Sequence, residues 1–318
     1  MKVNRMNKRQ RVIFSWVLIA IYAIVTIGRR TFAPNLLSPA ISTGLATFVP
    51  FIFLFVHGSL SYRLRDLLVF VGITLVVSNI LENMSVITGF PFGHYDYTDT
   101  LGPKLFLVPI LIGPAYVATG YLAWTIARVI AGATDTRLLG HLTFSVPLLA
   151  AFMMVSWDLS MDPLFSTINQ SWVWRDGGSY FGVPVSNFFG WLLTTYVFFQ
   201  LFALYLKGRS TASATNQSSS AAELLQALVF YGLIGAGYLL NILKQDLGET
   251  VADPAGVIWR AGDIYAVTGL LTLFTMGTFI LIGLVRLAVV SSTDQNASRE
   301  AISGFTVPYN PERQLSES

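Results

Sequence analysis

Apolar residues in this chain are gathered into stretches of about twenty, and this grouping limits the fold more than any other feature. A helix of about that length crosses the hydrocarbon core of a bilayer. Hydrophobic residues make up 53% of the sequence and charged residues only 12%, whereas a soluble domain usually carries about 25% charged residues. The pattern predicts an all-α, polytopic membrane helix bundle of about eight transmembrane helices, at residues 12–28, 40–60, 67–87, 105–129, 139–157, 182–206, 222–243 and 264–288.

The distribution of Lys and Arg predicts how these helices are oriented. With eight spans, the two termini lie on the same side of the membrane, and fourteen of the twenty basic residues are on that side. Cytoplasmic loops carry the excess of basic residues, so we expect a multi-pass protein of the cell membrane with both termini in the cytoplasm. The basic N-terminal stretch indicates a membrane anchor, and no nucleic-acid partner is expected. No small-residue cleavage site follows the first apolar stretch, which is therefore expected to be a retained helix.

The predicted spans are expected to form one domain that covers residues 1–290. A segment rich in Ser and Thr, at about 208–221, is typical of a flexible cytoplasmic link between the sixth and seventh helices. The polar residues 291–318 are predicted to form a disordered cytoplasmic tail.

Cysteine and histidine are too rare for several kinds of site. The absence of cysteine excludes disulfides, iron–sulfur clusters and thiol nucleophiles. The three histidines are scattered along the chain and are too few for a di-iron site. No metal-binding or nucleotide-binding motif is evident, so we expect neither a metal nor another cofactor. Glycine, aromatic and acidic residues collect in the loops on the predicted outer side, where function is therefore expected.

Glu82 is the acidic residue in the most informative position. It lies in the third predicted span, where an ionisable side chain is costly and usually faces a cavity or a partner. Asn79, Glu82 and Asn83 follow an i, i+3, i+4 spacing, which is expected to place them on one helix face. Burial favours the neutral acid, so Glu82 is a candidate proton donor. Alternatively, its side chain extends to water from the outer end of the helix.

Asp158 and Asp162 form a second acidic cluster. On a helix their spacing of four would stack the two carboxyl groups on one side, where they could share a proton. Alternatively, the helix ends here, because Asp162-Pro163 is a common start of a turn.

Asp96 is the third acidic candidate, and it stands between Tyr95 and Tyr97 in an outer loop. Aromatic residues at this depth also form the ordinary belt at a membrane surface. Asn187 and Trp191 open the sixth predicted span, where hydrogen bonding between helices is the default role of a polar residue.

Several motifs in this order resemble the membrane carotenoid hydratase family, of the bisanhydrobacterioruberin hydratase and carotenoid 1,2-hydratase type. The motifs are Glu82, Thr88-Gly-Phe-Pro-Phe-Gly-His-Tyr-Asp-Tyr97, Leu101-Gly-Pro103, Val108-Pro109, Met161-Asp-Pro163, Trp172-Val-Trp174, Tyr180-Phe-Gly-Val-Pro-Val-Ser-Asn187 and Gly190-Trp191. They cover roughly residues 78–191, and the other helices match only as membrane spans. His94 stands where the family pattern has another aromatic residue, which points to a different substrate.

The resemblance implies a hydro-lyase of carotenoid biosynthesis that adds water to the terminal carbon–carbon double bond of an acyclic carotenoid, without a cofactor. Such chemistry needs an acid, a positioned water molecule and aromatic faces for a transient cation. The candidate catalytic residues are Glu82 as the acid, Asp158, Asp162 and Asp96. The candidates for binding water or substrate are Asn79, Asn83, Tyr95, Tyr97, Trp157, Trp172, Trp174, Tyr180, Asn187 and Trp191.

Two other classes of function stay open. A membrane prenyltransferase would bind a magnesium diphosphate through paired aspartates, for which Asp96-Tyr-Thr-Asp99 and the Asp158–Asp162 pair have a suitable spacing. Basic residues that would bind the diphosphate are sparse on that side. A transporter or carotenoid-binding protein would need no acid at all. The expected partners are an acyclic carotenoid, the lipid bilayer and other membrane enzymes of the carotenoid pathway.

Overall fold

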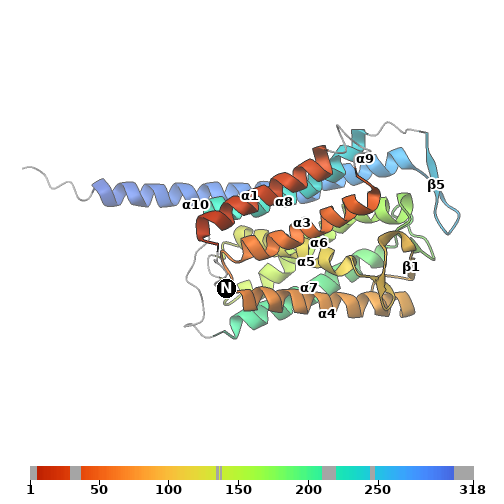
Figure 1. The fold of residues 1–318 in the computed structure, drawn as a ribbon, viewed down its shortest axis with the longest axis horizontal. Coiled ribbons are helices and arrows are strands. Elements are labelled where there is room, and N and C mark those ends of the chain that lie inside the picture. Colours follow the sequence, from red (N-terminus) through yellow and green to blue (C-terminus); the bar gives the residue numbers. More distant parts are fainter. Residues whose placement is uncertain are drawn as a thin grey trace, which may run out of the picture.

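The computed structural model describes residues 6–28, 37–133, 136, 138–209, 220–243 and 248–303. Over these ranges the chain is an all-α bundle whose long helices run side by side (Figure 1). The helices are α1 (Lys8–Ala23), α3 (Pro39–Gly58), α4 (Leu64–Thr88), α5 (Ile112–Ile130), α6 (Leu142–Pro163), α7 (Val185–Lys207), α8 (Ala221–Leu239), α9 (Ala261–Leu271) and α10 (Gly277–Ser303). Short π or 3-10 segments are η1 (Ile24–Gly28), η2 (Asp99–Leu101), η3 (Leu164–Ile168), η5 (Leu240–Leu243) and η6 (Thr272–Met276).

Among the described residues, seven helices are long and apolar enough to cross a membrane. They include the continuous helix formed by α9, η6 and α10. The predicted fourth span corresponds to α5, which is not among the seven and is buried along most of its length. Helix α5 contacts α3, α4, α6, α8 and α10. A helix enclosed by protein needs no apolar surface toward lipid, so it can carry more polar residues than its neighbours. The prediction of an all-α polytopic bundle is confirmed.

Two helix boundaries differ from the predicted spans, and both differences affect the candidate site. The fourth helix begins at Ile112 instead of residue 105, because residues 104–109 form a hairpin of β2 (Lys104–Leu105) and β3 (Val108–Pro109). Helix α6 passes the predicted end at residue 157 and continues to Pro163. Both aspartates of the second acidic cluster therefore lie inside the helix, and not in a turn after it.

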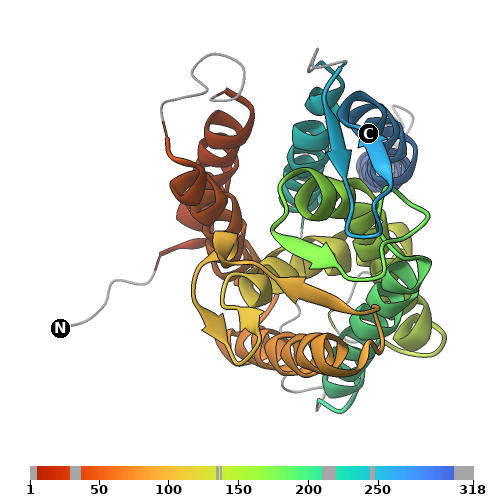
Figure 2. The same cartoon turned by 90° about the vertical axis from the view of Figure 1, so that its right-hand side faces the viewer.

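Short strands gather at the end of the bundle opposite the start of α1, which we call the strand end (Figures 1 and 2). Strand β1 (Tyr95–Tyr97) follows α4 and pairs antiparallel with β4 (Trp172–Trp174), which follows α6. Strand β5 (Thr250–Ala252) pairs with β6 (Ile258–Arg260) in a hairpin before α9. The β1–β4 pair thus ties two outer loops together over the bundle. The outward orientation of this end stays a prediction.

Helix α10 extends into the segment that was predicted to be a tail. It continues to Ser303, beyond the predicted boundary at 290, and extends past the other helices in Figure 1. Each residue added to an existing helix gains a hydrogen bond without a new nucleation step, so the polar residues 291–303 can prolong the helix. Residues 304–318, and residues 210–219 of the predicted link, lie outside the described residues.

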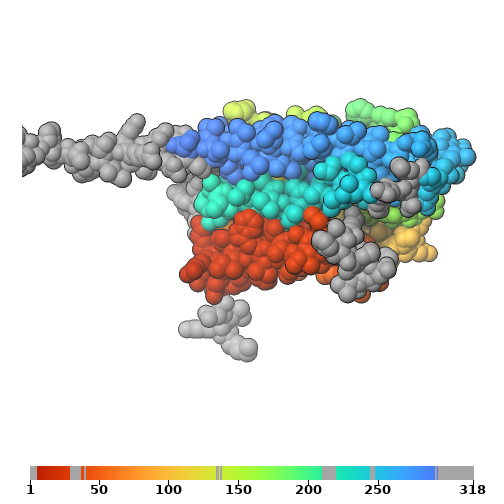
Figure 3. Space-filling view, turned by 90° about the horizontal axis from the view of Figure 1, so that it is seen from above, coloured from red at the N-terminus to blue at the C-terminus, as the bar shows by residue number. Residues whose placement is uncertain are grey.

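Ion pairs hold the helices together at the end opposite the strands. Arg209 contacts the buried carboxylate of Asp66 at 2.9 Å, which connects the end of α7 to the start of α4. Lys8 contacts Glu223 at 2.8 Å, which connects α1 to α8. Figure 3 shows α8 lying between α1 and α10 on one face of the molecule. Helices α1 and α8 thus lie side by side, and both line the larger cavity described below.

Candidate functional site

The carboxyl group of Glu82 is enclosed by tyrosines near the strand end of α4, where the side chain is only 4% exposed. The Tyr116 hydroxyl on α5 donates a hydrogen bond to Glu82 Oε1 at 2.7 Å. The Tyr97 hydroxyl donates to Oε2 at 2.9 Å, and the Tyr95 hydroxyl donates to the same oxygen. Glu82 therefore does not extend to water, and three phenols satisfy its oxygens inside the protein.

Burial keeps the β1 phenols in their neutral form. It raises the pKa of Tyr95 and of Tyr97 well above the usual value, and the nearby Glu82 carboxylate raises both further. Both hydroxyls therefore retain their protons near neutrality. They are available as hydrogen-bond donors to any negative charge on Glu82.

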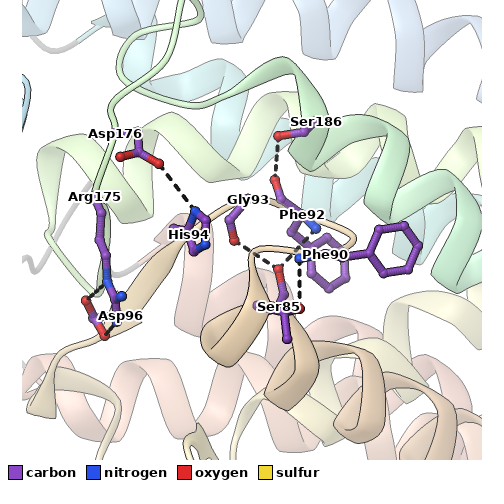
Figure 4. Close-up of polar contacts among 10 residues, drawn as sticks. Ser85, Phe90, Phe92, Gly93, His94, Asp96, Arg175, Asp176 and Ser186 are labelled. Carbon is purple, nitrogen blue, oxygen red and sulfur yellow. Dashed lines mark hydrogen bonds and ion pairs between the residues drawn. The ribbon is translucent and has the colours of Figure 1, made fainter.

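Strand alternation separates the three residues of β1. Tyr95 and Tyr97 point inward, whereas Asp96 points outward, because successive side chains of a strand face opposite sides. The Arg175 guanidinium donates two hydrogen bonds of 2.6 Å to the half-exposed Asp96 carboxylate, as Figure 4 shows. These bonds hold the pKa of Asp96 below its usual value. Asp96, a predicted catalytic residue, lies outside the site as an ionised surface group.

The turn after α4 is fixed by serine hydroxyls, which positions Phe92 (Figure 4). Gly89 ends the helix with a φ of 79°, a left-handed conformation that suits glycine. The Ser85 hydroxyl donates to the carbonyl of Gly93 at 2.9 Å and accepts from the N–H of Phe92 at 3.1 Å. The Ser186 hydroxyl, at the start of α7, donates to the Phe92 carbonyl at 2.8 Å. The turn is thus anchored to two helices.

The second acidic cluster lies on the inner face of α6, where Asp158 and Asp162 are both buried one turn apart. The side-chain amide of Asn187 donates to both carboxyl groups, with nitrogen–oxygen distances of 2.7 Å. The indole N–H groups of Trp172 and Trp174 donate to Asp162 Oδ1 at 2.9 and 3.3 Å. Asp158 Oδ1 is buried and has no hydrogen-bond partner among the described residues. Buried polar atoms are usually paired, so this oxygen is an exception, and Asp158 lines none of the cavities described below.

A small cavity of about 40 Å³ lies between Glu82 and Asp162, which both line it. It is lined by Glu82, Phe92, Tyr95, Tyr97, Ile112, Ala115, Tyr116, Trp157, Met161, Asp162, Trp172, Trp174, Asn187 and Trp191. The Trp191 ring stacks on Tyr116, with centroids 4.3 Å apart and planes 7° from parallel. The space is large enough for about one water molecule. We call it the carboxyl cavity.

A larger cavity of about 310 Å³ adjoins the carboxyl cavity. Five residues line both, namely Ile112, Ala115, Trp157, Met161 and Trp172. The larger cavity extends from there between α1 with η1, α3, α5, α6 and α8, and apolar side chains form most of its wall. We call it the apolar chamber. A long apolar molecule in this chamber would have its end at the carboxyl cavity.

Two predicted site residues of α4 lie away from these cavities. The Asn83 amide donates to the Asn79 carbonyl at 2.7 Å, and its oxygen accepts from a backbone N–H in the β2–β3 turn at 2.9 Å. The buried face of α4 includes Ser78, Glu82 and Ser85. On a helical wheel the asparagines lie to the other side of Glu82. Instead of lining the site, they fix the β2–β3 hairpin through the contact that Asn83 makes with its turn.

Tyr180 also lies outside both cavities. Its hydroxyl donates to the Leu159 carbonyl at 2.8 Å and so fixes the loop before α7. In contrast, Tyr116 contacts Glu82 directly, although it was not among the predicted residues. Its signal in the sequence was a phenol inside the fourth predicted span, but the span alone does not show which way the phenol faces.

The comparisons with known proteins cover most of this region. A family profile described as carotenoid biosynthesis protein matches residues 41–245, which is more than half of the chain. The chain belongs to this family. The match includes Glu82, Asp158 and Asp162. This finding confirms the resemblance inferred from the motifs and identifies a multi-pass membrane protein of carotenoid biosynthesis.

A curated protein to which the chain is similar is bisanhydrobacterioruberin hydratase from Haloarcula japonica. It is 29% identical over 187 residues, which are 56% of this chain and 58% of the relative. The chain therefore matches less than two thirds of that protein's length. No solved structure matches the chain.

Proposed function

We propose that this protein adds water to the terminal carbon–carbon double bond of an acyclic carotenoid end group. The observation that supports this most directly is the carboxyl cavity, which has a carboxyl group on each side and opens into an apolar chamber. The family supports a carotenoid as the substrate class, and the name of the relative supports a hydratase reaction.

The first step of the proposed reaction is proton transfer from Glu82. Its carboxylic O–H delivers the proton to the less substituted alkene carbon, and the π electrons form the new C–H bond. A tertiary cation remains on the neighbouring carbon. The aromatic faces of Trp157 and Trp191 lie around this position and stabilise positive charge. The three phenols that donate to Glu82 stabilise the carboxylate left behind.

Capture of the cation is the second step, and it takes place on the other side of the cavity. Asp162, which lines the cavity, holds a water molecule, whose oxygen forms the new C–O bond. The water gives one proton to the aspartate pair, where Asn187 holds both carboxyl groups. Return of a proton to Glu82 completes the cycle. The sum is one alkene plus one water to one tertiary alcohol.

The apolar chamber sets how the substrate binds in this proposal. Ligand pockets usually measure about 300–1,000 Å³, and the chamber, at about 310 Å³, is at the lower limit of that range. It therefore holds one end of a long polyene, while the remainder of the polyene stays among the lipids. This mode of binding presents one end group at a time to Glu82.

The geometry supports the prenyltransferase alternative less well. Asp96 pairs with Arg175 and Asp99 with Lys104, and both aspartates lie at the surface. Asp158 and Asp162 are buried under the β1–β4 pair. The two predicted aspartate motifs therefore do not face a common diphosphate site.

The proposed reaction can be measured directly with protein purified into lipid vesicles. Given an acyclic carotenoid with an unsaturated end, the protein should form a product heavier by one water molecule, with its new oxygen taken from isotopically labelled water. Turnover should continue with a chelator present. No hydrated product, together with magnesium-dependent turnover of a prenyl diphosphate, would contradict the proposal.

A substitution at Ala115 should block the passage between the two cavities, because this small residue lines both. In Ala115→Phe, the added ring should keep the carotenoid end away from Glu82, and misplacement of about 1 Å can lower a rate by about 10²-fold. Product per amount of membrane-inserted protein measures the effect. Ala115→Ser, which leaves the passage open, is the control. Undiminished turnover by Ala115→Phe would show that the substrate does not pass here.

A further inference from the structure

Each turnover of the proposed reaction consumes one water molecule, but an occupied apolar chamber would leave no path for water on that side. We propose that water enters through a separate cavity of about 220 Å³ at the strand end, on the other side of Trp174. This inference rests on the proposed function. It assigns separate routes to the two substrates, one from the lipid and one from the aqueous phase.

The lining of this third cavity suits water. It is formed by Ser166, Thr167, Gln170, Val173, Trp174, Gly182, Ala252, Asp253 and Pro254. Gln170, Ala252 and Pro254 are exposed, so the cavity opens to solvent there. Ser166 and Thr167 are buried and place two hydroxyl groups at its inner end. We call it the water inlet. Ala252, Asp253 and Pro254 of its lining belong to the β5–β6 hairpin. Figure 2 shows this hairpin at the strand end of the bundle.

A single layer of residues separates the water inlet from the second acidic cluster. Trp174 lines both the inlet and the carboxyl cavity, and its indole N–H donates to Asp162 Oδ1. Ser166, on the inlet side, donates from its hydroxyl to the backbone carbonyl of Asp162 at 2.9 Å. Movement of one indole ring would therefore connect solvent with the position where the proposed water attacks.

Hydrogen bonds and an aromatic contact fix the β5–β6 hairpin that covers the water inlet. Buried Asp253 accepts hydrogen bonds of 2.9 Å from the Val257 N–H and from the Trp259 indole. The Trp259 ring packs edge-on against Phe181, with centroids 5.4 Å apart. These contacts hold the β5–β6 hairpin over η3 and keep the inlet open.

Thiol labelling tests this route, and the cysteine-free chain provides a clean background. In open membranes, a charged, hydrophilic thiol reagent should modify Ser166→Cys. It should not modify Ser160→Cys, which is buried on α6 and lines none of the three cavities. We expect rates that differ at least about tenfold, because thiol modification follows exposure to the aqueous reagent. Equal protection of the two cysteines would overturn the proposal. Thr167→Cys replaces Ser166→Cys if that variant does not fold.

Blocking the opening of the water inlet with a bulky group tests whether the reaction uses this route. A bulky hydrophilic maleimide on Ala252→Cys should lower hydration in proportion to the labelled fraction, while carotenoid binding persists. The matched control is Ile258→Cys, which lies opposite Ala252 in the hairpin but outside the inlet. Full hydration by the plugged protein would overturn the proposal. If the wild type hydrates no carotenoid but Ser166→Cys is still labelled, the proposed function fails and the aqueous route stands.

Discussion

Replacing Glu82 with glutamine should abolish hydration and leave the protein folded in the membrane. The amide keeps the size of the side chain; its oxygen can still accept hydrogen bonds from the phenols of Tyr95 and Tyr97, and its nitrogen can donate to the hydroxyl of Tyr116. It has no carboxylic proton to give to the alkene. Because general acid catalysis is worth about 10²–10⁴-fold, product per amount of membrane protein should fall by that factor.

The role of Glu82 in the first step can be isolated with deuterated water. Reversible protonation by the wild type should exchange hydrogen for deuterium at the end group, and Glu82→Gln should lose this exchange together with hydration. Glu223→Gln is the matched control, because Glu223 is also buried but pairs with Lys8 at the other end of the bundle. It should lower the protein level and keep the activity per molecule. Normal hydration by Glu82→Gln would remove Glu82 from the mechanism.

Replacing Asp162 with asparagine should block water capture without blocking protonation. Asp162 lines the carboxyl cavity and accepts hydrogen bonds from Trp172 and Asn187, so its loss removes both the proton acceptor and the orientation of the water. Hydration should fall by about 10²–10⁴-fold, as for the loss of a general base. An uncaptured cation loses a proton and returns to an alkene, so deuterium exchange should persist.

Asp96→Asn is the matched control for this variant, because Asp96 is ion-paired with Arg175 at the surface. Its hydration activity should stay near that of the wild type. Loss of both hydration and exchange in Asp162→Asn would contradict the division of roles, and would indicate that Asp162 acts together with Glu82 in the first step. Unchanged hydration would exclude Asp162 from the reaction.

The sequence could predict those features of the site that depend only on the position and spacing of residues within one segment. An ionisable residue in an apolar span is costly, which singled out Glu82 without any knowledge of its neighbours. A spacing of four predicted that Asp158 and Asp162 stack if they lie on a helix, but whether the helix reaches them stayed open until the structure carried α6 to Pro163. The repeated Trp and Tyr residues of two outer loops indicated an aromatic site, although not that the loops pair as β1 and β4.

The tertiary structure decided which way each side chain faces. The rotation of α4 about its axis turns Glu82 inward and Asn83 toward a hairpin, and the rotation of α5 brings Tyr116 to the Glu82 carboxyl group. The register of β1 against β4 puts Tyr95 inside and Asp96 outside.

The sequence by itself thus determined a helical membrane bundle with candidate acids near the ends of its spans, because bilayer thickness and the cost of burying charge act on each segment separately. Only the tertiary structure decided how the acids, phenols and cavities are combined. Helix rotation and strand register are set by packing between segments far apart in the chain, and a one-residue change in register would exchange the two faces of β1.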